Sequence, residues 1–284
     1  MFSEPDDSGV VRRMREAHGV ACGVLGAAIG SSDPVGEAWG WRGRTLGRAV
    51  IGAHGAGWLR VVHSPVGKAS GKLWAGPEDA ERAVPLEVPR PRLRAVREWA
   101  EGEDAFRAEL YEYVGGHVLT AGDVSGLTAS WWIQLRTALE RLSGVPTERV
   151  AVRQAYMDRA MPKYLGFLDA PVPTTPPAWT TAHGDLHWAN LTGPDLRILD
   201  WEGWGIAPAG YDAAMLHAYS LAVPESAERV RRELSGFLGC AAGRLAELVV
   251  ITELLQSAER GDNLELVPAL RARAREVRGR MDGR

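Results

Sequence analysis

The sequence predicts an α+β protein with two lobes, a small antiparallel sheet followed by a larger and mostly helical part. Two observations predict this layout. Short β-like segments separated by glycines fill residues 36–114. After the glycine pair Gly115–Gly116, apolar residues recur at helical spacing through most of the chain. We therefore expect one domain at residues 1–115 and a second at residues 116–284.

The first lobe opens with a predicted amphipathic helix over residues 9 to about 26, because its apolar residues recur every three or four positions. Five β-like segments follow, namely EAWGW, GRAVIG, GWLRVV, PRLRAVREW and AFRAELYEYV. Between the third and the fourth, the stretch GPEDAERAV predicts a short helix. Pro77 and the acidic residues after it are typical of a helix N-terminus.

The second lobe opens with an apolar stripe over residues 127–142, in which we expect Trp131 and Trp132 to belong to the core. Further helices are predicted over residues 148–168, 212–222, 225–238 and 241–259, and at the basic C-terminus. The proline-rich stretch 171–177 ends the first of them.

Composition limits the classes of function. Of the 284 residues 45% are apolar, which is enough for a substantial core. The net charge of −3 gives no general attraction to nucleic acid or to anionic lipid, so we expect neither as a partner. Cys22 and Cys240 lie far apart in the sequence, which argues against a disulfide framework or a thiolate metal site. The apolar run 19–30 is too short for a membrane span. We expect a cytoplasmic protein whose size is typical of enzymes.

Most of the candidate functional residues lie in residues 183–205, the stretch HGDLHWANLTGPDLRILDWEGWG. Gly193-Pro194-Asp195 is a strong turn signal between two short β-like pieces, which predicts a hairpin. In this hairpin Asn190 lies nearly opposite Leu199 and Asp200. One amide oxygen and one carboxylate that face the same space suit Mg²⁺, which often has only one or two protein ligands.

Asp185 lies five residues before Asn190, on the loop that enters the hairpin. A carboxylate there can accept a proton from an attacking hydroxyl, so Asp185 is the candidate catalytic residue. His183 belongs to the same catalytic loop, where we expect it to hold the loop rather than to act as acid or base. A zinc site that uses the alternating His183, Asp185 and His187 is a weaker alternative, because no further His or Cys lies nearby.

The order of these residues resembles the catalytic core of the aminoglycoside phosphotransferase and choline kinase group, which shares the protein-kinase-like fold. The resembling positions are His183-Gly184-Asp185, Asn190, Asp200-Trp201-Glu202, Pro208 and Asp212. The two-lobe layout extends the resemblance over most of the chain. It implies that ATP and Mg²⁺ are the cofactors and that the γ-phosphoryl group moves to a hydroxyl of a small molecule.

The resemblance also implies roles for single residues. Asp185 becomes the catalytic base or the hydroxyl-orienting residue, and Asn190 and Asp200 become the magnesium ligands. Asp212 resembles the family's structural aspartate, which would cap N–H groups at the start of the next helix. For Glu202 two roles stay open, orientation of water on the metal or membership of a hydrogen-bond network.

The nucleotide end departs from the kinase pattern. Kinases use a lysine on the third strand, but Lys68, Lys72 and Lys163 are the only lysines and none lies in a convincing strand. The segment GWLRVV instead carries Arg60, which can bind phosphate and carboxylate oxygens with a different geometry. An exposed strand arginine is the alternative interpretation, and Lys68 and Lys72 are the fallback cations.

Two further parts of the nucleotide site are predicted. Glu81 and Glu78 on the short helix compete as the acidic partner of the phosphate-binding cation. The backbone of Glu112, Tyr113 and Val114, at the hinge between the lobes, is expected to pair with the adenine edge.

The acceptor is less defined. An aminoglycoside-like polycation requires acidic side chains, for which Glu202, Glu253, Glu259 and Asp262 are candidates. Three tryptophans near the motif could instead surround a choline-like ammonium group, or belong to the core. They are Trp188, Trp201 and Trp204. A kinase-like protein that binds nucleotide without turnover is the alternative function, because the third-strand lysine is absent.

Overall fold

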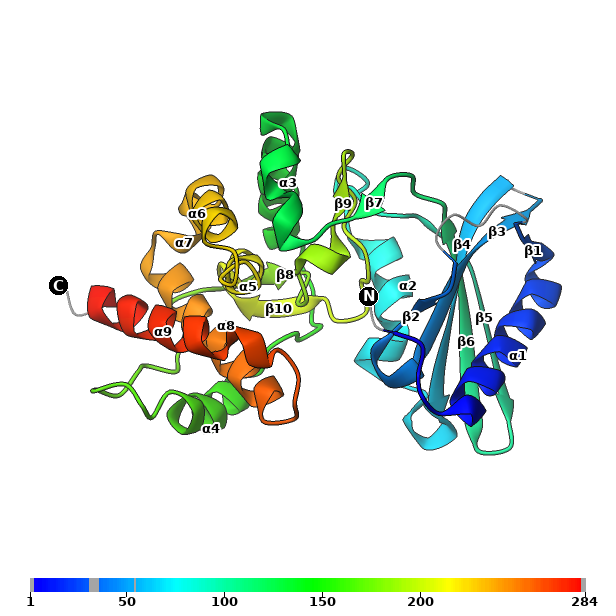
Figure 1. Cartoon of the computed structure of the whole chain (residues 1–284), viewed down its shortest axis with the longest axis horizontal. Helices are drawn as coiled ribbons and strands as arrows, with labels where there is room; N and C mark the ends of the chain where they lie inside the picture. Colours follow the sequence, from blue (N-terminus) through cyan, green and yellow to red (C-terminus); the bar gives the residue numbers. More distant parts are fainter. Residues whose placement is uncertain (1–2, 31–35, 54, 282–284) are drawn as a thin grey trace. The chain divides into compact units, whose positions relative to one another are not determined.

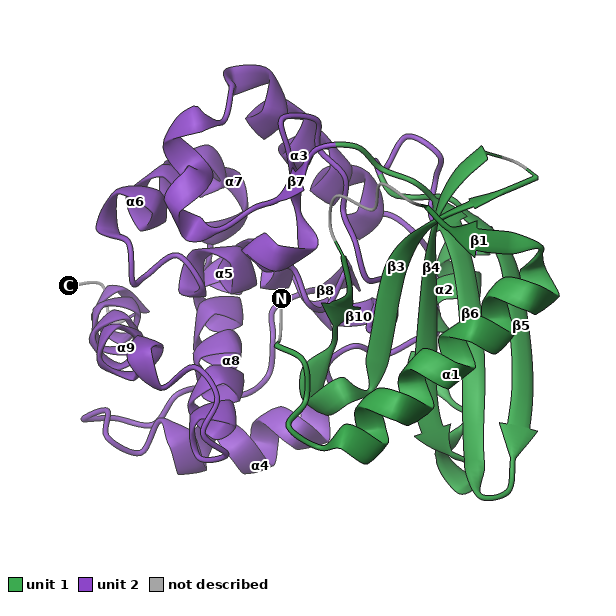
Figure 2. Cartoon of the chain, turned by 45° about the vertical axis from the view of Figure 1, so that its right-hand side comes forward, with its two compact units in different colours: residues 1–82, 90–115 green, residues 83–89, 116–284 purple. Residues whose placement is uncertain are grey.

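The computed structural model describes residues 3–30, 36–53 and 55–281. The chain forms two compact units, which Figure 2 distinguishes by colour. Unit 1 contains residues 1–82 and 90–115, and unit 2 contains residues 83–89 and 116–284. Residues 83–89 thus belong to unit 2, although the sequence predicted a single boundary after residue 115.

Unit 1 is built on a six-stranded antiparallel sheet. Its strands in spatial order are β1 (Ala27–Ile29), β3 (Thr45–Gly52), β4 (Gly55–Pro65), β6 (Asp104–Glu112) and β5 (Leu93–Glu101), with β2 (Ala38–Trp39) also paired to β3. The sheet confirms the five predicted segments, although EAWGW shortens to the two residues of β2. The strand β1 was not predicted, since three residues carry no alternation to detect.

The two faces of this sheet differ in character. Helix α1 (Ser8–Leu25) lies along one face, as Figure 2 shows, and buries Met14 against Leu59 and Val61 of β4. Successive side chains of a strand point to opposite faces, so Arg60 and Val62 of β4 lie on the other face. Helix α2 (Lys72–Ala83) covers part of that second face.

Helix α2 begins five residues before the position expected from Pro77, which lies inside the helix. Trp74, in the added first turn, packs against Val62 and Ala105 of the sheet. Its indole N–H also donates to Glu98 at 2.8 Å. Burial of this large side chain stabilises a turn that the local sequence does not favour, because tertiary packing supplies most of the stability of a short helix.

Unit 2 is mainly helical. Its helices are α3 (Ala129–Ser143), α4 (Gln154–Tyr164), α5 (Tyr211–Ala218), α6 (Pro224–Glu233), α7 (Ser235–Leu238), α8 (Ala241–Ala258) and α9 (Val267–Met281). Helix α8 is buried along most of its length and packs against α4, α5, α7 and α9 (Figure 1). Trp131 and Trp132 of α3 are almost fully buried, so the expectation that they belong to the core is confirmed.

Two short antiparallel ladders complete unit 2. Strand β8 (Trp179–Ala182) pairs with β10 (Gly205–Pro208), and β7 (His117–Val118) pairs with β9 (Thr192–Gly193). Helix α4 is shorter than the predicted 148–168, because Ala151 and Val152 donate their N–H groups to the carbonyl of Ile206 in β10. These ladders hold the ends of the segment that contains the polar motif.

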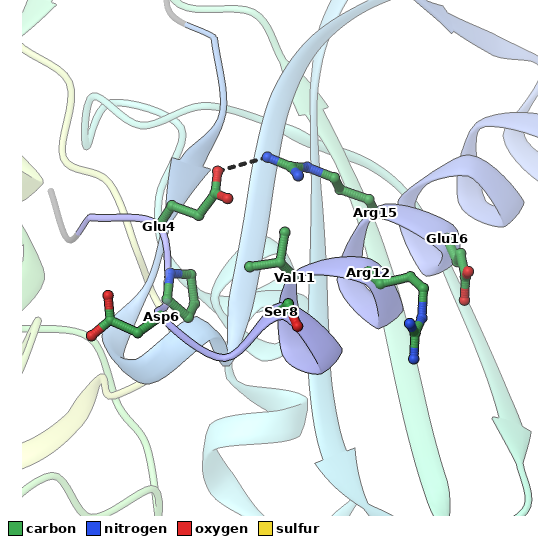
Figure 3. Close-up of a pocket in the computed structure, with 8 residues that line it drawn as sticks. Glu4, Asp6, Ser8, Val11, Arg12, Arg15 and Glu16 are labelled. Atoms are coloured by element: carbon green, nitrogen blue, oxygen red, sulfur yellow. Dashed lines mark hydrogen bonds and ion pairs between the residues drawn. The ribbon is translucent and has the colours of Figure 1, made fainter.

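Among the described residues, no helix is both long and apolar enough to span a bilayer. A pocket of about 450 Å³ lies at the start of α1 (Figure 3). Its charged lining residues include Glu4, Arg12 and Arg15, and Arg15 donates to Glu4 at 2.6 Å. None of the residues predicted for the functional site lines this pocket.

Candidate functional site

The loop that follows β8 depends on a glycine. Gly184 has a φ of +85°, a conformation that L side chains rarely adopt. A Cβ at this position would lie 2.8 Å from the carbonyl oxygen of Gly203 and 3.2 Å from the Cβ of Ala151. Gly184 therefore permits the backbone of this loop to lie close to the backbone at Gly203, in the segment after Asp200.

Asp212 anchors this loop from helix α5. Its carboxylate accepts the N–H of His183 at 2.7 Å and the N–H of Gly184 at 3.0 Å. Burial raises the pKa of Asp212, while its electrostatic interaction with His183 and its hydrogen bonds from the two N–H groups act in the opposite direction. The expected cap of its own helix is wrong, since the cap position of α5 is Gly210 and Asp212 binds the backbone of the loop after β8 instead.

His183 is fully buried, with an exposed fraction of 0%. Its Nε2 lies 2.8 Å from the carbonyl oxygen of Leu199, which can only accept, so Nε2 carries the proton. Burial lowers the pKa of His183, which favours the neutral ring. The ring also meets Trp201 edge to face at 4.8 Å. His183 therefore ties the loop to the segment before Asp200, which agrees with the expectation that it holds the loop.

Asp185 presents its carboxylate to solvent, with 51% of the side chain exposed. His187 Nε2 lies 3.6 Å from one carboxylate oxygen, and Asn190 Nδ2 donates to the backbone carbonyl of Asp185 at 2.8 Å. Burial of part of the group raises its pKa, but the contacts with His187 and Asn190 lower it more, so the pKa of Asp185 lies below its usual range. An ionised and accessible carboxylate is suited to accept a proton.

The predicted hairpin register is present. Leu199 donates its N–H to the carbonyl of Asn190 at 2.8 Å, and Leu191 bridges to Ile198. Asn190 therefore lies opposite Leu199, next to Asp200, as the sequence predicted. The regular part of the hairpin is short, because Trp188–Asn190 forms a 3₁₀ turn and β9 pairs with β7.

The donor chemistry at this point fits Mg²⁺. The amide nitrogen of Asn190 is engaged with Asp185, which leaves the amide oxygen as the atom that can bind a cation. Asp200 has a φ of +58°, an uncommon backbone conformation for a residue other than glycine and one that often marks functional sites. Hard oxygen donors of this kind are those that Mg²⁺ prefers. The roles of Asn190 and Asp200 as ligands stay predictions.

Arg149 secures the segment after Asp200. Its guanidinium donates to the carbonyl of Glu202 at 3.1 Å and to the carbonyl of Trp204 at 3.2 Å, and it lies 5.2 Å from the Trp204 ring centre. Arg149 was not predicted as a site residue, because no local sequence signal marks an arginine more than 50 positions upstream of the segment that it binds. Glu202 itself is partly exposed, and both of its predicted roles remain open.

In unit 1, Arg60 of β4 forms an ion pair with Glu109 of β6 at 3.5 Å. Glu81 of α2 instead accepts from Arg92 Nε at 2.7 Å and from the N–H of Leu93 at 3.2 Å. Glu81 was predicted as a nucleotide-site residue on the assumption that a glutamate of α2 pairs with the cation, and this pairing is wrong. Arg90 and Arg92, which lie between α2 and β5, both form ion pairs with Glu81.

At the predicted hinge, Glu112 is the last residue of β6, and its N–H donates to the carbonyl of Arg92 at 2.8 Å. That N–H group is therefore not free for a nucleobase. Tyr113 and Val114 follow as irregular, partly buried backbone at the end of unit 1. Binding of adenine by this segment stays a prediction.

The comparisons with known proteins agree with this geometry. The sequence profile described as the phosphotransferase enzyme family matches residues 79–248, more than half of the chain. The chain belongs to this phosphotransferase family. The matched region includes residues 183–205, so the enzyme class predicted from the motif is confirmed. No curated protein sequence matched the chain.

Solved structures show the same fold at low sequence identity. The choline kinase LicA from Streptococcus pneumoniae has a TM-score of 0.53 and 11% identity, over 92% of this chain and 99% of that one. An ethanolamine kinase from Plasmodium vivax has a TM-score of 0.52 and 9% identity, over 98% and 95%. LicA in complex with AMP has a TM-score of 0.50 and 11% identity, over 92% and 99%. These likenesses confirm the α+β, protein-kinase-like fold of this phosphotransferase.

Beside Asp185, the phosphotransferase has a cluster of tyrosine and acidic side chains that sequence reasoning only partly found. The ring of Tyr219 lies 5.2 Å from that of His187. Burial raises the pKa of Tyr219 to about 12, and the charges of nearby carboxylates add to the rise. These carboxylates are Asp185, Glu253 and Asp262. The hydroxyl of Tyr211 donates to Glu253, which fixes this glutamate next to the loop.

Two other acceptor predictions change. Glu259 accepts from Lys163 at 3.0 Å and from Tyr164 at 2.7 Å on the exposed surface, so a cation already neutralises it. All three tryptophans around the motif are at most 5% exposed, and the aromatic box for an ammonium group is therefore wrong. They are Trp188, Trp201 and Trp204.

Proposed function

We propose that this phosphotransferase moves the γ-phosphoryl group of ATP to a hydroxyl of a small, amine-bearing molecule, with Mg²⁺ as the metal. The observation that carries the proposal is the single hydrogen-bonded unit formed by Asp185, Asn190 and the backbone next to Asp200. A proton acceptor and two oxygen donors for a hard cation are held within one short loop and hairpin. Phosphoryl transfer needs mainly such positioning and charge neutralisation.

Each residue of the unit has a defined task in this proposal. Asp185 orients the acceptor hydroxyl and accepts its proton. Asn190 and Asp200 hold Mg²⁺, which when bound neutralises the charge of the phosphates. Asp212 and His183 keep the loop in place from two sides, and neither of them touches the substrate.

The acceptor is proposed to be cationic because the side chains near Asp185 are acidic or hydroxyl-bearing. Glu253 and Asp262 are partly exposed and both act on the pKa of Tyr219. An amine is attracted to such a group of carboxylates. Aminoglycosides and smaller amino alcohols both meet this description, and the fold neighbours named for choline and ethanolamine support the second class.

The experiment compares three variants of the whole chain, Asp185→Asn, Asp200→Ala and the matched control Asp195→Asn, whose carboxylate is exposed at the hairpin turn. Calorimetry measures the Kd of Mg·ATP, and a panel of amino alcohols and aminoglycosides with labelled ATP measures turnover. Asp185→Asn should leave the Kd nearly unchanged and reduce turnover by about 10²- to 10⁴-fold. Asp200→Ala should weaken binding of Mg·ATP, while Asp195→Asn behaves as wild type.

Full turnover by Asp185→Asn would contradict the role of this residue. The alternative function, nucleotide binding without turnover, is favoured by Arg60 in place of the third-strand lysine, since the two side chains are not equivalent at a phosphate. Stabilisation of wild type by Mg·ATP without turnover of any acceptor in the panel would support it. We further propose a cytoplasmic location, because both cysteines are unpaired.

A further inference from the structure

One buried arginine organises the second face of the sheet in unit 1. Arg107 of β6 has a side chain that is 1% exposed and contacts three carboxylates. Its Nη2 donates to Glu78 of α2 at 2.8 Å, its Nε donates to Glu109 at 3.0 Å, and its Nη1 donates to Glu98 of β5. Arg107 therefore links the helix to two strands of the sheet.

Glu109 connects this arginine to the strand that carries Arg60. The side chain of Glu109 is 2% exposed, and its two oxygens have different partners. Oε1 accepts from Arg107 Nε, whereas Oε2 accepts from the hydroxyl of Tyr111 at 2.9 Å and lies 3.5 Å from Arg60 Nη1. Arg60 and Glu109 are also directly opposite each other in the register of β4 and β6.

The charges explain why this arrangement restricts Arg60. A buried carboxylate is costly unless cations and hydrogen bonds compensate it, and loss of one partner of a buried ion pair is strongly destabilising. Glu109 therefore holds the Arg60 guanidinium on the same face as α2. The Arg60 side chain remains 14% exposed, so part of it can meet a ligand.

We propose that Glu109 is the positioning residue for Arg60 as a phosphate-binding cation. Arg107, which binds both α2 and Glu109, couples the position of α2 to the positions of Glu109 and Arg60. This inference rests on the proposed function. In protein kinases the strand lysine pairs directly with a glutamate of the helix. Here the connection runs from Glu78 through Arg107 and Glu109 to Arg60. An arginine ordered in advance binds a phosphate with a smaller loss of side-chain freedom.

The test uses Glu109→Gln, with Glu98→Gln as the matched control. Glu98 also accepts from Arg107, but its side chain is 49% exposed and is not paired with Arg60 in the register of the sheet. Calorimetry gives the Kd of Mg·ATP for each whole-chain variant below its melting temperature. Glu109→Gln should raise the Kd about 3- to 10-fold, the cost of ordering one long side chain on binding. Glu98→Gln should change it less than about twofold.

A double-mutant cycle separates positioning from a merely structural role. If Glu109 acts through Arg60, then Glu109→Gln should have no further effect on the Kd in an Arg60→Met background. Additive effects, an unchanged Kd in Glu109→Gln, or an equal effect of Glu98→Gln would overturn the inference. Glu109→Asp, which keeps the charge but shortens its reach, answers the same question if the glutamine variant does not fold.

The proposed function can fail separately. Wild type that binds no Mg·ATP would overturn the nucleotide site and with it this role of Glu109. Wild type that binds Mg·ATP while Glu109→Gln binds equally well would overturn the role of Glu109 alone.

Discussion

Replacement of Asp212 by asparagine tests how the loop that contains Asp185 is held. The carboxylate accepts two backbone N–H groups, the buried one of His183 at 2.7 Å and the partly buried one of Gly184 at 3.0 Å. Asparagine has the same shape but only one acceptor oxygen, so one N–H loses its partner and meets an amide NH₂ instead. A buried donor without a partner costs about 1–3 kcal/mol.

Removal of the buried charge offsets part of this cost, because burial already raises the pKa of Asp212. We therefore expect a loss of stability in the lower part of the range, about 1–2 kcal/mol. For a domain of the size of unit 2, this corresponds to a fall in Tm of roughly 2–8 °C. The turnover should fall more steeply, by about 10²-fold, since displacement of the loop by about 1 Å misplaces Asp185.

Calorimetric melting and steady-state turnover measure the two effects, with Asp195→Asn as the control for loss of a carboxylate near the site. Kd for Mg·ATP serves as a third readout and should change less than turnover. Asp212→Asn with the Tm and turnover of wild type would refute the reasoning, because the two N–H groups would then not depend on the carboxylate.

The other predictions concern helix packing and the segment proposed to hold Mg²⁺. Arg273→Met removes the two hydrogen bonds to buried Glu247, at 2.7 and 2.9 Å, and leaves this carboxylate with His217, so we expect a loss of about 3–5 kcal/mol at neutral pH in thermal melts. Burial raises the pKa of Glu247, but His217 and Arg273 lower it by more, so the net pKa lies below its usual value of 4.5. The stabilisation by these partners is therefore present above pH about 4.5 and is lost as the pH falls through the lowered pKa. The difference in Tm between Arg273→Met and wild type should shrink in acid. Arg149→Met releases the carbonyls after Asp200, and nucleotide-binding titrations should show half-saturation at a Mg²⁺ concentration about 10-fold higher. An unchanged Mg²⁺ requirement would show that the segment holds its shape without Arg149.

Local signals were sufficient for much of the site. The turn Gly193-Pro194-Asp195 and the alternation around it predicted that Asn190 lies opposite Leu199, and the hydrogen bond between their backbones agrees. The order of the polar residues was sufficient to place the chain in a phosphotransferase family, which the profile match confirms. The hairpin depends on neighbours within about ten residues, where the backbone and the spacing of side chains restrict the geometry.

Long-range partners were the part that sequence reasoning could not supply. Asp212 was expected to cap its own helix, but it binds N–H groups 28 and 29 positions earlier. Arg60 pairs with Glu109 of a neighbouring strand instead of a glutamate of α2, because the register of the sheet places the two side chains opposite each other. Arg149 had no local signal at all.

The amino-acid sequence by itself determined the two-lobe α+β class, most of the helices and strands, and the phosphotransferase family. Hydrophobic periodicity and turn residues act over short distances and are therefore visible in one dimension. Only the tertiary structure decided which carboxylate meets which cation or N–H group. A buried charge is compensated by whatever groups packing brings to it, and the partners come from elements distant in the chain.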